Sequence, residues 1–317
     1  MCVLQIGLIG KANVGKSTFF SAATETIVAS GNFPFTTIEP NIGMAFVQSD
    51  CACKHFDVKH ENPLCVNGTR LIPVKLIDVA GLVPGAHEGK GLGNQFLDDA
   101  RQAEILIHVV DIAGTTDIQG QPIPLGTHDP LEDVAFVQDE FDQWFIDILK
   151  REWDKVTREV DQKRAKLTDG IAKRFSGLGI KEHEVQSVLQ KQGLVAKNPK
   201  EWIDSDIENF VKELRQNTKP MIIAANKADL CKDLDILKKI SGVVIPCSAE
   251  TELLLRKATK AGIINYTSGD DGFKINEEKE LPAPQQKALD LVKTIFSKIP
   301  STGIQKILNT AVFDSLN

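Results

Sequence analysis

The residues best suited to chemistry lie near the start of the chain, where a glycine is followed after four residues by Gly15-Lys16-Ser17. This spacing is typical of a phosphate-binding loop between a strand and a helix. Small residues let backbone N–H groups curl around a phosphate, Lys16 would reach the β- and γ-phosphates, and the Ser17 hydroxyl would bind Mg²⁺. The predicted phosphate-binding residues are Gly10, Lys11, Ala12, Asn13, Val14, Gly15, Lys16, Ser17 and Thr18.

A carboxylate follows a second apolar run, because Asp78 comes directly after residues 71–77 and begins the sequence Asp78-Val79-Ala80-Gly81. A carboxylate at the carboxyl end of a strand beside a phosphate-binding loop holds Mg²⁺, directly or through water. Gly81 has no side chain, so its backbone N–H can approach the γ-phosphate. We expect Asp78 to be a magnesium ligand rather than a helix cap or turn residue, and Gly81 to act in catalysis.

A third motif, Asn226-Lys227-Ala228-Asp229, follows another apolar run and is suited to binding the base of the nucleotide. The Asp229 carboxylate can accept both the N1–H and the exocyclic N–H of guanine, and adenine offers no such pair of donors. A wrong base leaves polar groups unpaired, so discrimination can reach roughly 10⁴-fold. We expect Lys227 to lie over the base and Asn226 to tie this loop to the phosphate-binding loop. The predicted guanine-binding residues are Asn226, Lys227, Asp229, Ser248 and Ala249.

Two further segments have the composition of nucleotide-dependent switches. A switch offers a hydroxyl to Mg²⁺ and an N–H to the γ-phosphate, and Thr36 and Thr37 in the segment 31–41 can do this. We favour Thr37 as the magnesium ligand, with an ordinary proline-bearing loop as the alternative. The segment 82–97 is too rich in glycine for a stable helix at its start. Its His87 could order a water molecule, although a solvent-facing histidine is the favoured alternative.

Apolar runs predict the strands that must carry these residues. They indicate an α/β fold of the P-loop NTPase class, with a mostly parallel sheet and helices on both faces. The runs are residues 3–9, 43–47, 71–77, 105–111, 220–225 and 243–247. Helices are predicted at 18–24, 96–103, 252–260, 284–298 and 302–316.

About a hundred residues separate the fourth and fifth of these runs, too many for one crossover. We therefore predict a nucleotide-binding domain in two pieces, 1–128 and 218–317, interrupted by a helical insertion at 129–217. Apolar residues in steps of three and four predict one long helix over 131–174. Shorter helices are expected at 181–191 and 199–216.

Composition excludes several classes of protein. The 317-residue chain has a net charge of −6 and a sequence pI of about 5.6, so it is not a basic nucleic-acid coat. No apolar run approaches the eighteen or so residues that a transmembrane helix needs, and no signal peptide is visible. We expect a cytoplasmic monomer without a membrane partner.

The stretch 150–174 is basic inside this acidic chain, with nine basic and five acidic residues and hence a net charge of +4. Such a surface suits RNA phosphates. A solvated helix with intrahelical ion pairs explains the same charges and is favoured on the sequence alone.

Three cysteines lie close together in the sequence: Cys51, Cys53 and Cys65, with His55 and His60 between them. The spacing is not that of the usual cysteine pair of a structural zinc site, and there is no second pair. The sequence therefore favours a polar hairpin loop that holds thiols over a metal site.

Two segments resemble a known family. Residues 33–41, Phe-Pro-Phe-Thr-Thr-Ile-Glu-Pro-Asn, and residues 78–86, followed by Gly-Lys-Gly-Leu-Gly-Asn-Gln-Phe-Leu, are similar to the switches of the Obg family of translation-factor-related GTPases. The detailed sequence resembles the YchF branch in its archaeal form, over essentially the whole length. The resemblance implies a Ras-like G domain with a coiled-coil-like helical insertion, GTP or GDP with Mg²⁺ as ligands, and contact with the ribosome or rRNA through the insertion. It makes an RNA surface at 150–174 about as well supported as ion pairing. Such proteins usually continue into a small TGS domain, so we expect a truncated or partial chain.

Three residues set expectations about turnover. Bacterial and eukaryotic members of the branch lack the aspartate found here as Asp229 and are associated with ATP, so this chain is expected to bind guanine. Leu82 stands where Ras-like enzymes carry a water-positioning glutamine, and leucine cannot hydrogen-bond water. Asn13 resembles the P-loop asparagine of potassium-activated GTPases, and a role as a turn former is equally open. The predicted catalytic residues are Lys16, Thr37, Gly81 and Asn13, and the predicted switch residues are Thr36, Leu82 and His87.

The sequence thus favours a slow GTPase that acts as a nucleotide-dependent switch. One alternative is a nucleotide-dependent binding module with incidental turnover, which Leu82 favours. Another is an ATPase, which Asp229 opposes.

Overall fold

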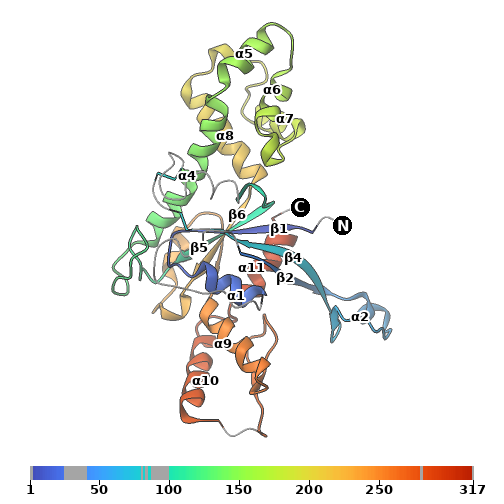
Figure 1. Cartoon of the computed structure of the whole chain (residues 1–317), viewed down its shortest axis with the longest axis vertical. Helices are drawn as coiled ribbons and strands as arrows, with labels where there is room; N and C mark the ends of the chain where they lie inside the picture. Colours follow the sequence, from blue (N-terminus) through green and yellow to red (C-terminus); the bar gives the residue numbers. More distant parts are fainter. Residues whose placement is uncertain are drawn as a thin grey trace.

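The predicted apolar runs form the strands of one sheet in the middle of an elongated molecule (Figure 1). The structure is a computed structural model that describes residues 3–24, 41–79, 81–82, 85–86, 100–278 and 281–315. Its seven-stranded sheet has the order β2-β4-β1-β5-β6-β7, with β3 paired to β4. The strands are β1 (Gln5–Ile9), β2 (Asn41–Asp50), β3 (Cys65–Val66), β4 (Thr69–Asp78), β5 (Ile105–Asp111), β6 (Met221–Asn226) and β7 (Val243–Pro246).

Strand direction brings the predicted motifs to one edge. β1 is parallel to β4 and β5, and β5, β6 and β7 follow in parallel, whereas β2 and β3 run antiparallel to β4. The carboxyl ends of parallel strands meet at the same edge of a sheet, where such folds bind ligands. In register, Leu8 pairs with Asp78, and Asp111 pairs with Asn226. The mostly parallel sheet that the sequence predicts is confirmed.

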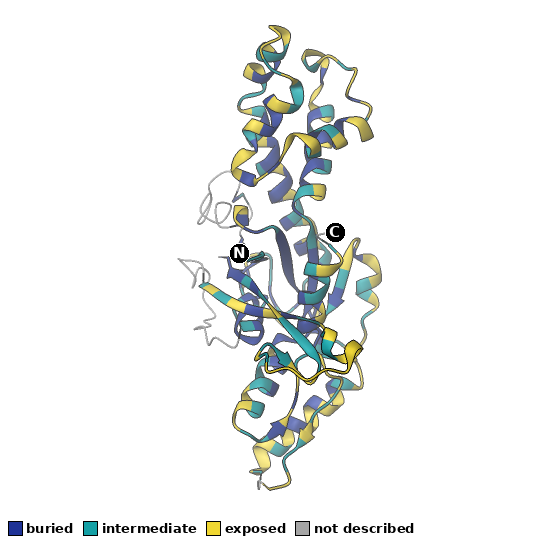
Figure 2. Ribbon diagram, turned by 90° about the vertical axis from the view of Figure 1, so that its right-hand side faces the viewer, coloured by how far each residue is buried: buried dark blue, intermediate teal, exposed yellow. Residues whose placement is uncertain are grey.

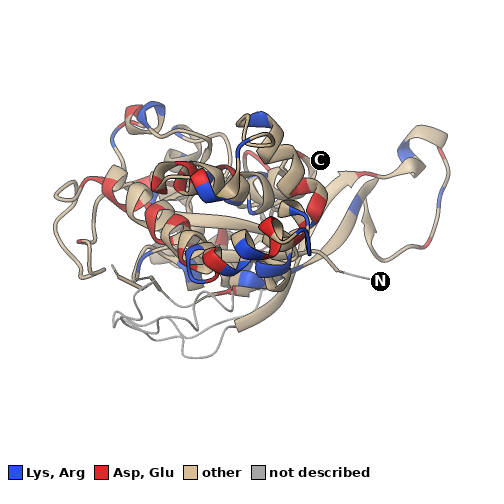
Figure 3. Cartoon of the chain, turned by 90° about the horizontal axis from the view of Figure 1, so that it is seen from above, with Lys and Arg blue, Asp and Glu red and all other residues tan. Residues whose placement is uncertain are grey.

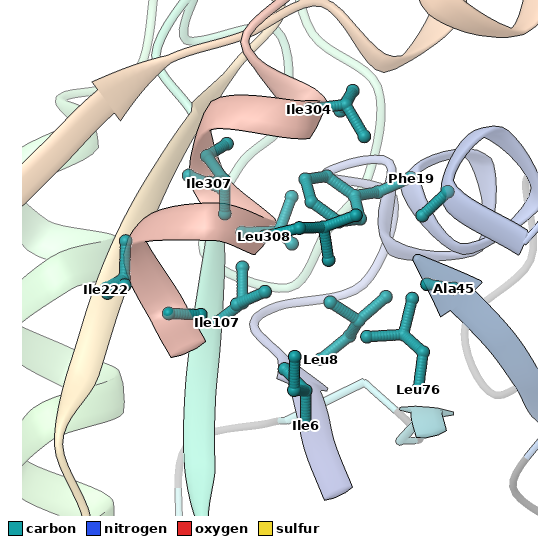
Figure 4. Close-up of a cluster of buried hydrophobic side chains, with 14 of the residues drawn as sticks. Ile6, Leu8, Phe19, Ala45, Leu76, Ile107, Ile222, Ile304, Ile307 and Leu308 are labelled. Carbon is teal, nitrogen blue, oxygen red and sulfur yellow. The ribbon is translucent and has the colours of Figure 1, made fainter. Parts of the chain in front are cut away.

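Helices cover both faces of this sheet. On one face α1 (Lys16–Thr24), α9 (Ala249–Lys260) and α11 (Ile304–Phe313) pack together. The apolar side of α11 enters the largest buried cluster, where Ile304, Ile307 and Leu308 meet Phe19 and the strands (Figure 4). The other face is covered by α4 (Pro130–Lys150), which packs against β5. Figure 2 shows that buried residues gather in the sheet and on the helix sides that face it.

The helical insertion is a second packing unit at one end of the molecule (Figure 1). Its helices are α4, α5 (Trp153–Asp161), α6 (Leu167–Arg174), α7 (Glu182–Lys191) and α8 (Asp204–Thr218). They share a buried cluster in which the rings of Phe145 and Phe175 stack with centroids 5.5 Å apart. α4 begins where Asp129 caps the helix and Pro130 occupies its first turn, as helix starts favour.

The prediction of one long helix over 131–174 is wrong, because α4 ends at Lys150 and two separate helices follow. A straight helix of that length would leave part of its apolar stripe in water. The observed breaks fold the stripe back, so that α4, α5 and α6 bury it together with α7 and α8.

The C-terminal part forms a smaller unit at the opposite end of the molecule. α9, α10 (Ala283–Phe296) and the short pair β8 (Ile264–Asn265) and β9 (Lys274–Ile275) surround a small buried cluster. Inside it the Glu252 carboxylate accepts hydrogen bonds from Tyr266 at 2.7 Å and Arg256 at 2.6 Å. Across the residues that the structure describes, no helix combines the length and apolar character that crossing a membrane requires.

Candidate nucleotide-binding site

The loop between β1 and α1 leaves no room for side chains at its two glycines. Gly10 and Gly15 have φ angles of +141° and +98°, which L side chains rarely adopt. A Cβ on Gly10 would lie 2.4 Å from the Val109 carbonyl oxygen, and one on Gly15 would lie 2.3 Å from the Asn226 amide nitrogen. The glycine spacing is therefore a requirement of packing between this loop, β5 and β6.

Lys16 lies at the start of α1 with its side chain only 7% exposed. Its ammonium donates hydrogen bonds to the carbonyls of Gly10 at 3.0 Å and Lys11 at 2.7 Å, so it spans the loop. Burial lowers the pKa of Lys16 from 10.5 to about 8, and Asp78 partly opposes this. A cation is thus held inside the loop where a phosphate would enter.

Ser17 and Asp78 lie side by side although they are far apart in the sequence. The Ser17 hydroxyl donates to Asp78 Oδ2 at 2.8 Å. The other oxygen of Asp78 is buried and has no hydrogen-bond partner in the described part of the chain. Burial raises the pKa of Asp78, and Lys16 and Ser17 oppose the rise. A hydroxyl beside an unsatisfied carboxylate oxygen is the oxygen donor set that Mg²⁺ prefers, so these residues fit that ion.

Asn226, at the end of β6, ties the predicted base loop to the phosphate-binding loop. Its amide nitrogen donates to the Val14 carbonyl at 2.8 Å, and its Oδ1 accepts from the Ala249 N–H at 3.0 Å. The predicted tie is confirmed. Lys227, in the left-handed region with φ of +62°, donates to Asp111 and Thr115 at 2.8 Å each.

Of the remaining base-loop residues, one has an unpaired carboxylate and two support the loop. Asp229 is half-buried, and its carboxylate makes neither a hydrogen bond nor an ion pair with any described residue. Ser248 is buried and caps α9 by accepting from the Thr251 N–H at 3.3 Å. The Ala249 N–H is already bonded to Asn226, so the structure gives Ser248 and Ala249 a positioning role, and their contact with a base stays a prediction.

Leu82 is fixed in the hydrophobic core. It is 1% exposed and packs in the cluster that contains Ile9 and Val79, while its N–H donates to the Gly10 carbonyl at 3.0 Å. Beside it, a Cβ on Gly81 would lie 3.2 Å from the Ala12 backbone, so this residue is held close to the phosphate-binding loop. The predicted switch residues Thr36, Thr37 and His87 lie outside the described residues.

Asn13 has a φ of +60°, and its side-chain nitrogen donates to the Gly120 carbonyl at 2.8 Å. A left-handed backbone suits asparagine better than most residues, which fits the turn-forming alternative. A potassium ligand at this position stays a prediction.

Sequence reasoning missed the partner of Lys11. The Lys11 ammonium forms an ion pair with Asp133 of α4 at 2.7 Å, with both side chains 1% exposed, and donates to the Thr116 carbonyl at 3.0 Å. His128 also contacts Asp133, with Nε2 and Oδ1 2.8 Å apart. The side chain of Lys11 therefore connects the phosphate-binding loop to α4 of the insertion, and only the backbone of Lys11 remains available to bind phosphate. Asp133 looked like an ordinary acidic residue in a first helical turn, so the sequence held no signal for this contact.

A phosphate loop, a carboxylate beside its serine and an anchored base loop on one edge of a parallel sheet define a P-loop GTPase fold. A family model described as 50S ribosome-binding GTPase matches residues 5–141. A second model, described as the Obg-like GTPase YGR210-like, G4 motif-containing domain, matches residues 224–317.

Comparison with individual relatives identifies the family to which the chain belongs within this fold. It is 46% identical to a GTP-binding protein of Methanocaldococcus jannaschii, over 99% of this chain and 79% of that protein. It is 37% identical to a GTP-binding protein of Pyrococcus horikoshii OT3 whose crystal structure matches with a TM-score of 0.76, over 99% of this chain and 79% of that one. The ribosome-binding ATPase YchF of Bacillus subtilis is 30% identical over 71% of this chain, which spans 57% of that protein. The chain belongs to the Obg/YchF family of GTP-binding proteins, as its motifs predict.

Proposed function

We propose that the protein binds GTP with Mg²⁺ at this site, hydrolyses it slowly to GDP and phosphate, and acts as a nucleotide-dependent switch. The observation that carries the proposal is Asp229. Its carboxylate has no hydrogen-bonding or ion-pairing partner among the described residues, and it follows an Asn226 that is bonded to the phosphate-binding loop. An unpaired carboxylate on a loop anchored in this way can accept hydrogen bonds from two donors of guanine, whereas adenine does not offer that pair of donors.

Hydrolysis is attack of water on the γ-phosphate, and phosphoryl transfer asks the protein mainly for positioning and charge stabilisation. Lys16, the loop N–H groups and the Gly81 N–H would stabilise the charge on the phosphate oxygens. Ser17, Asp78 and, as a prediction, Thr37 would hold Mg²⁺, which neutralises phosphate charge when bound. The buried Leu82 offers no group that could orient the water, so we expect slow turnover by the chain alone.

The output of the switch would pass through α4. This helix carries Asp133, which pairs with Lys11 of the phosphate-binding loop, and Glu140, which accepts a hydrogen bond from the Gly85 N–H. Gly85 belongs to the predicted second switch. Since α4 also forms part of the buried cluster of the insertion, a change at either contact would act directly on that unit.

A ribosome or RNA partner would contact the insertion. Support comes from the descriptions of the matching family model and of the Bacillus subtilis relative. Figure 3, which colours the ribbon by residue type, shows basic and acidic residues interspersed along the chain as seen from above. Several of the basic residues are paired with acids: Lys150 with Asp204 and Glu208, Lys155 with Glu152, and Arg174 with Glu152 and Glu159. Exposed basic residues without an ion pair among the described residues remain in the turn between α5 and α6 and in the last turn of α6, namely Lys163, Arg164, Lys166 and Lys173. We expect these four to make any contact with RNA, and the chain to work as a cytoplasmic monomer.

The proposal is tested by single-turnover GTP hydrolysis with and without ribosomal subunits, using Lys16→Ala as the inactive control. We expect slow turnover alone and faster turnover with the partner, and a pull-down that recovers subunits with a nonhydrolysable GTP analogue but not with GDP. Nucleotide-dependent capture without any stimulation would favour the binding module that Leu82 also permits. Absence of both GTP binding and hydrolysis would refute the proposal.

A further inference from the structure

The strands β2 and β4 extend beyond the body of the molecule and carry a projecting tip formed by residues 51–68 (Figure 1). The tip contains α2 (Ala52–Phe56) and β3 and closes through the Cys51 N–H, which donates to the Gly68 carbonyl at 2.9 Å. This closure brings together three thiols and one imidazole that are scattered in the sequence. The ligand atoms of Cys51, Cys53, His60 and Cys65 all lie within 4.8 Å of one another.

Two separations between these ligand atoms match those of a tetrahedral metal site. The Cys53 and Cys65 sulfurs are 3.7 Å apart, and Cys51 Sγ lies 3.4 Å from His60 Nε2. A tetrahedral zinc ion with bonds of about 2.3 Å to sulfur and about 2.0 Å to nitrogen separates two sulfurs by about 3.8 Å and a sulfur from a nitrogen by about 3.5 Å. A disulfide would need sulfurs about 2.05 Å apart, and these cysteines are free thiols.

The tip also lacks the packing that would otherwise hold it. No residue from 51 to 68 is buried, and α2 has no buried side chain. The exposed fractions of Phe56, Val58 and Val66 are 68%, 55% and 50%. Units this small usually need a disulfide or a metal to hold one conformation. An apolar core therefore does not explain why these four side chains converge.

We propose that Cys51, Cys53, His60 and Cys65 bind one structural zinc ion that holds the tip of the β2–β4 hairpin. Three thiolates and one imidazole complete a tetrahedral site without an open position, which is the composition of a structural rather than a catalytic zinc centre. Thiolate ligands also select zinc over Mg²⁺. Binding replaces the thiol protons, so zinc uptake releases up to three protons to solvent. This proposal differs from the plain loop that the local spacing favours, because the pairing of β2 with β4, and not the local spacing, brings the four side chains together.

Zinc binding by His60 would cost a hydrogen bond that this residue makes within the tip. Its Nδ1 accepts a hydrogen bond from the Asn62 N–H at 3.2 Å. Coordination through Nε2 places the ring hydrogen on Nδ1, so this hydrogen bond is exchanged for the metal bond. We therefore expect removal of His60 to weaken zinc binding, whereas removal of a cysteine abolishes it. His55 lies on α2 outside the cluster and supplies a matched control.

The test is the metal content of the full chain purified under reducing conditions, followed by replacement of zinc with Co²⁺. We expect one zinc per chain and, with Co²⁺, thiolate-to-metal charge-transfer absorption together with the intense visible bands of tetrahedral cobalt. Cys53→Ser should lose both signals, and His60→Ala should bind more weakly, while His55→Ala and Cys231→Ser should match wild type. GDP binding by each variant reports whether the chain has folded.

A second measurement works on the wild-type chain alone. Chelation followed by zinc addition should restore hydrogen-exchange protection in residues 51–68 while leaving GDP binding unchanged. Wild-type chain that holds no stoichiometric zinc and gives no thiolate-to-cobalt absorption would overturn the proposal. So would a zinc content that Cys53→Ser leaves intact, or zinc-dependent protection that appears in the phosphate-binding loop instead of the tip.

Discussion

Replacing Asp133 with asparagine is expected to destabilise the chain by about 3–5 kcal/mol, because it leaves the Lys11 ammonium buried without its counter-ion. The pair spans 2.7 Å, and both side chains are 1% exposed, so solvent can neither screen nor replace the interaction. Lys11 would keep its hydrogen bond to the Thr116 carbonyl at 3.0 Å and at most a hydrogen bond to the neutral amide oxygen of the new side chain. At roughly 2–4 °C per kcal/mol for chains near this size, the melting temperature should fall by about 6–20 °C.

The assay is thermal unfolding followed by circular dichroism without nucleotide, since a bound nucleotide would itself stabilise the folded state. Glu132→Gln is the matched control. Glu132 precedes Asp133, is 66% exposed and lies 3.8 Å from His128, so its loss should cost no more than about 1 kcal/mol.

A double variant separates the ion pair from general damage to α4. Lys11→Met with Asp133→Leu removes both charges, and replacing a buried pair by apolar residues of similar volume is often neutral. We expect it to recover most of the stability that Asp133→Asn loses. A destabilisation by Asp133→Asn of less than about 1 kcal/mol would refute the reasoning. So would a double variant whose loss of stability equals the sum of the losses caused by Lys11→Met and Asp133→Leu alone.

Three further predictions concern cations, pH and partners. GTP hydrolysis should be faster in KCl than in NaCl, and Asn13→Ala should remove the difference; equal wild-type rates in the two salts would exclude a potassium ligand. His108 on β5 is 1% exposed, and burial, followed by the charge of Lys16, lowers its pKa from 6.5 to about 3. Its neutral form therefore supports the fold above pH 6.5, and stability falls as the pH drops from 6.5 towards 3, by up to about 1.4 kcal/mol per pH unit. Denaturant titrations should show a shallower fall for His108→Leu, and identical slopes would contradict this. Lys166→Glu with Lys173→Glu should weaken capture of ribosomal subunits and reduce its salt dependence without changing GDP affinity, as measured by sedimentation at several KCl concentrations; unchanged capture would exclude this surface.

The local sequence was sufficient to predict those elements whose own residue pattern indicates their structure. β5 is buried along its whole length, so its apolar run was visible without any knowledge of its neighbours. The spacing of the glycines likewise predicted the phosphate-binding loop. The structure explains this spacing, because the backbone angles and close contacts at these glycines exclude other residues. Asp78 and Asn226 were found in a similar way, since each comes at the end of an apolar run.

Features that depend on contacts between distant segments could not be read in this way. The breaks after Lys150 arise because five helices share one cluster, and no single helix shows this in its periodicity. The pair of Lys11 with Asp133 joins residues that are far apart in the chain, and neither residue is unusual in its own segment. The cysteines of the tip have an unfamiliar spacing in sequence and converge only because β2 and β4 pair along ten residues each.

The most direct test of the central claim is the affinity of the wild-type chain for GDP and for ADP, measured by titration calorimetry with Mg²⁺. An Asp229 carboxylate that accepts two donors from guanine predicts a preference for GDP of roughly 10⁴-fold, because adenine would leave the carboxylate unpaired. Asp229→Asn should lower GDP affinity and shift the preference towards xanthosine diphosphate, whose base offers an acceptor where guanine has the exocyclic amine. Equal affinities, or tighter binding of ADP than of GDP, would contradict the account.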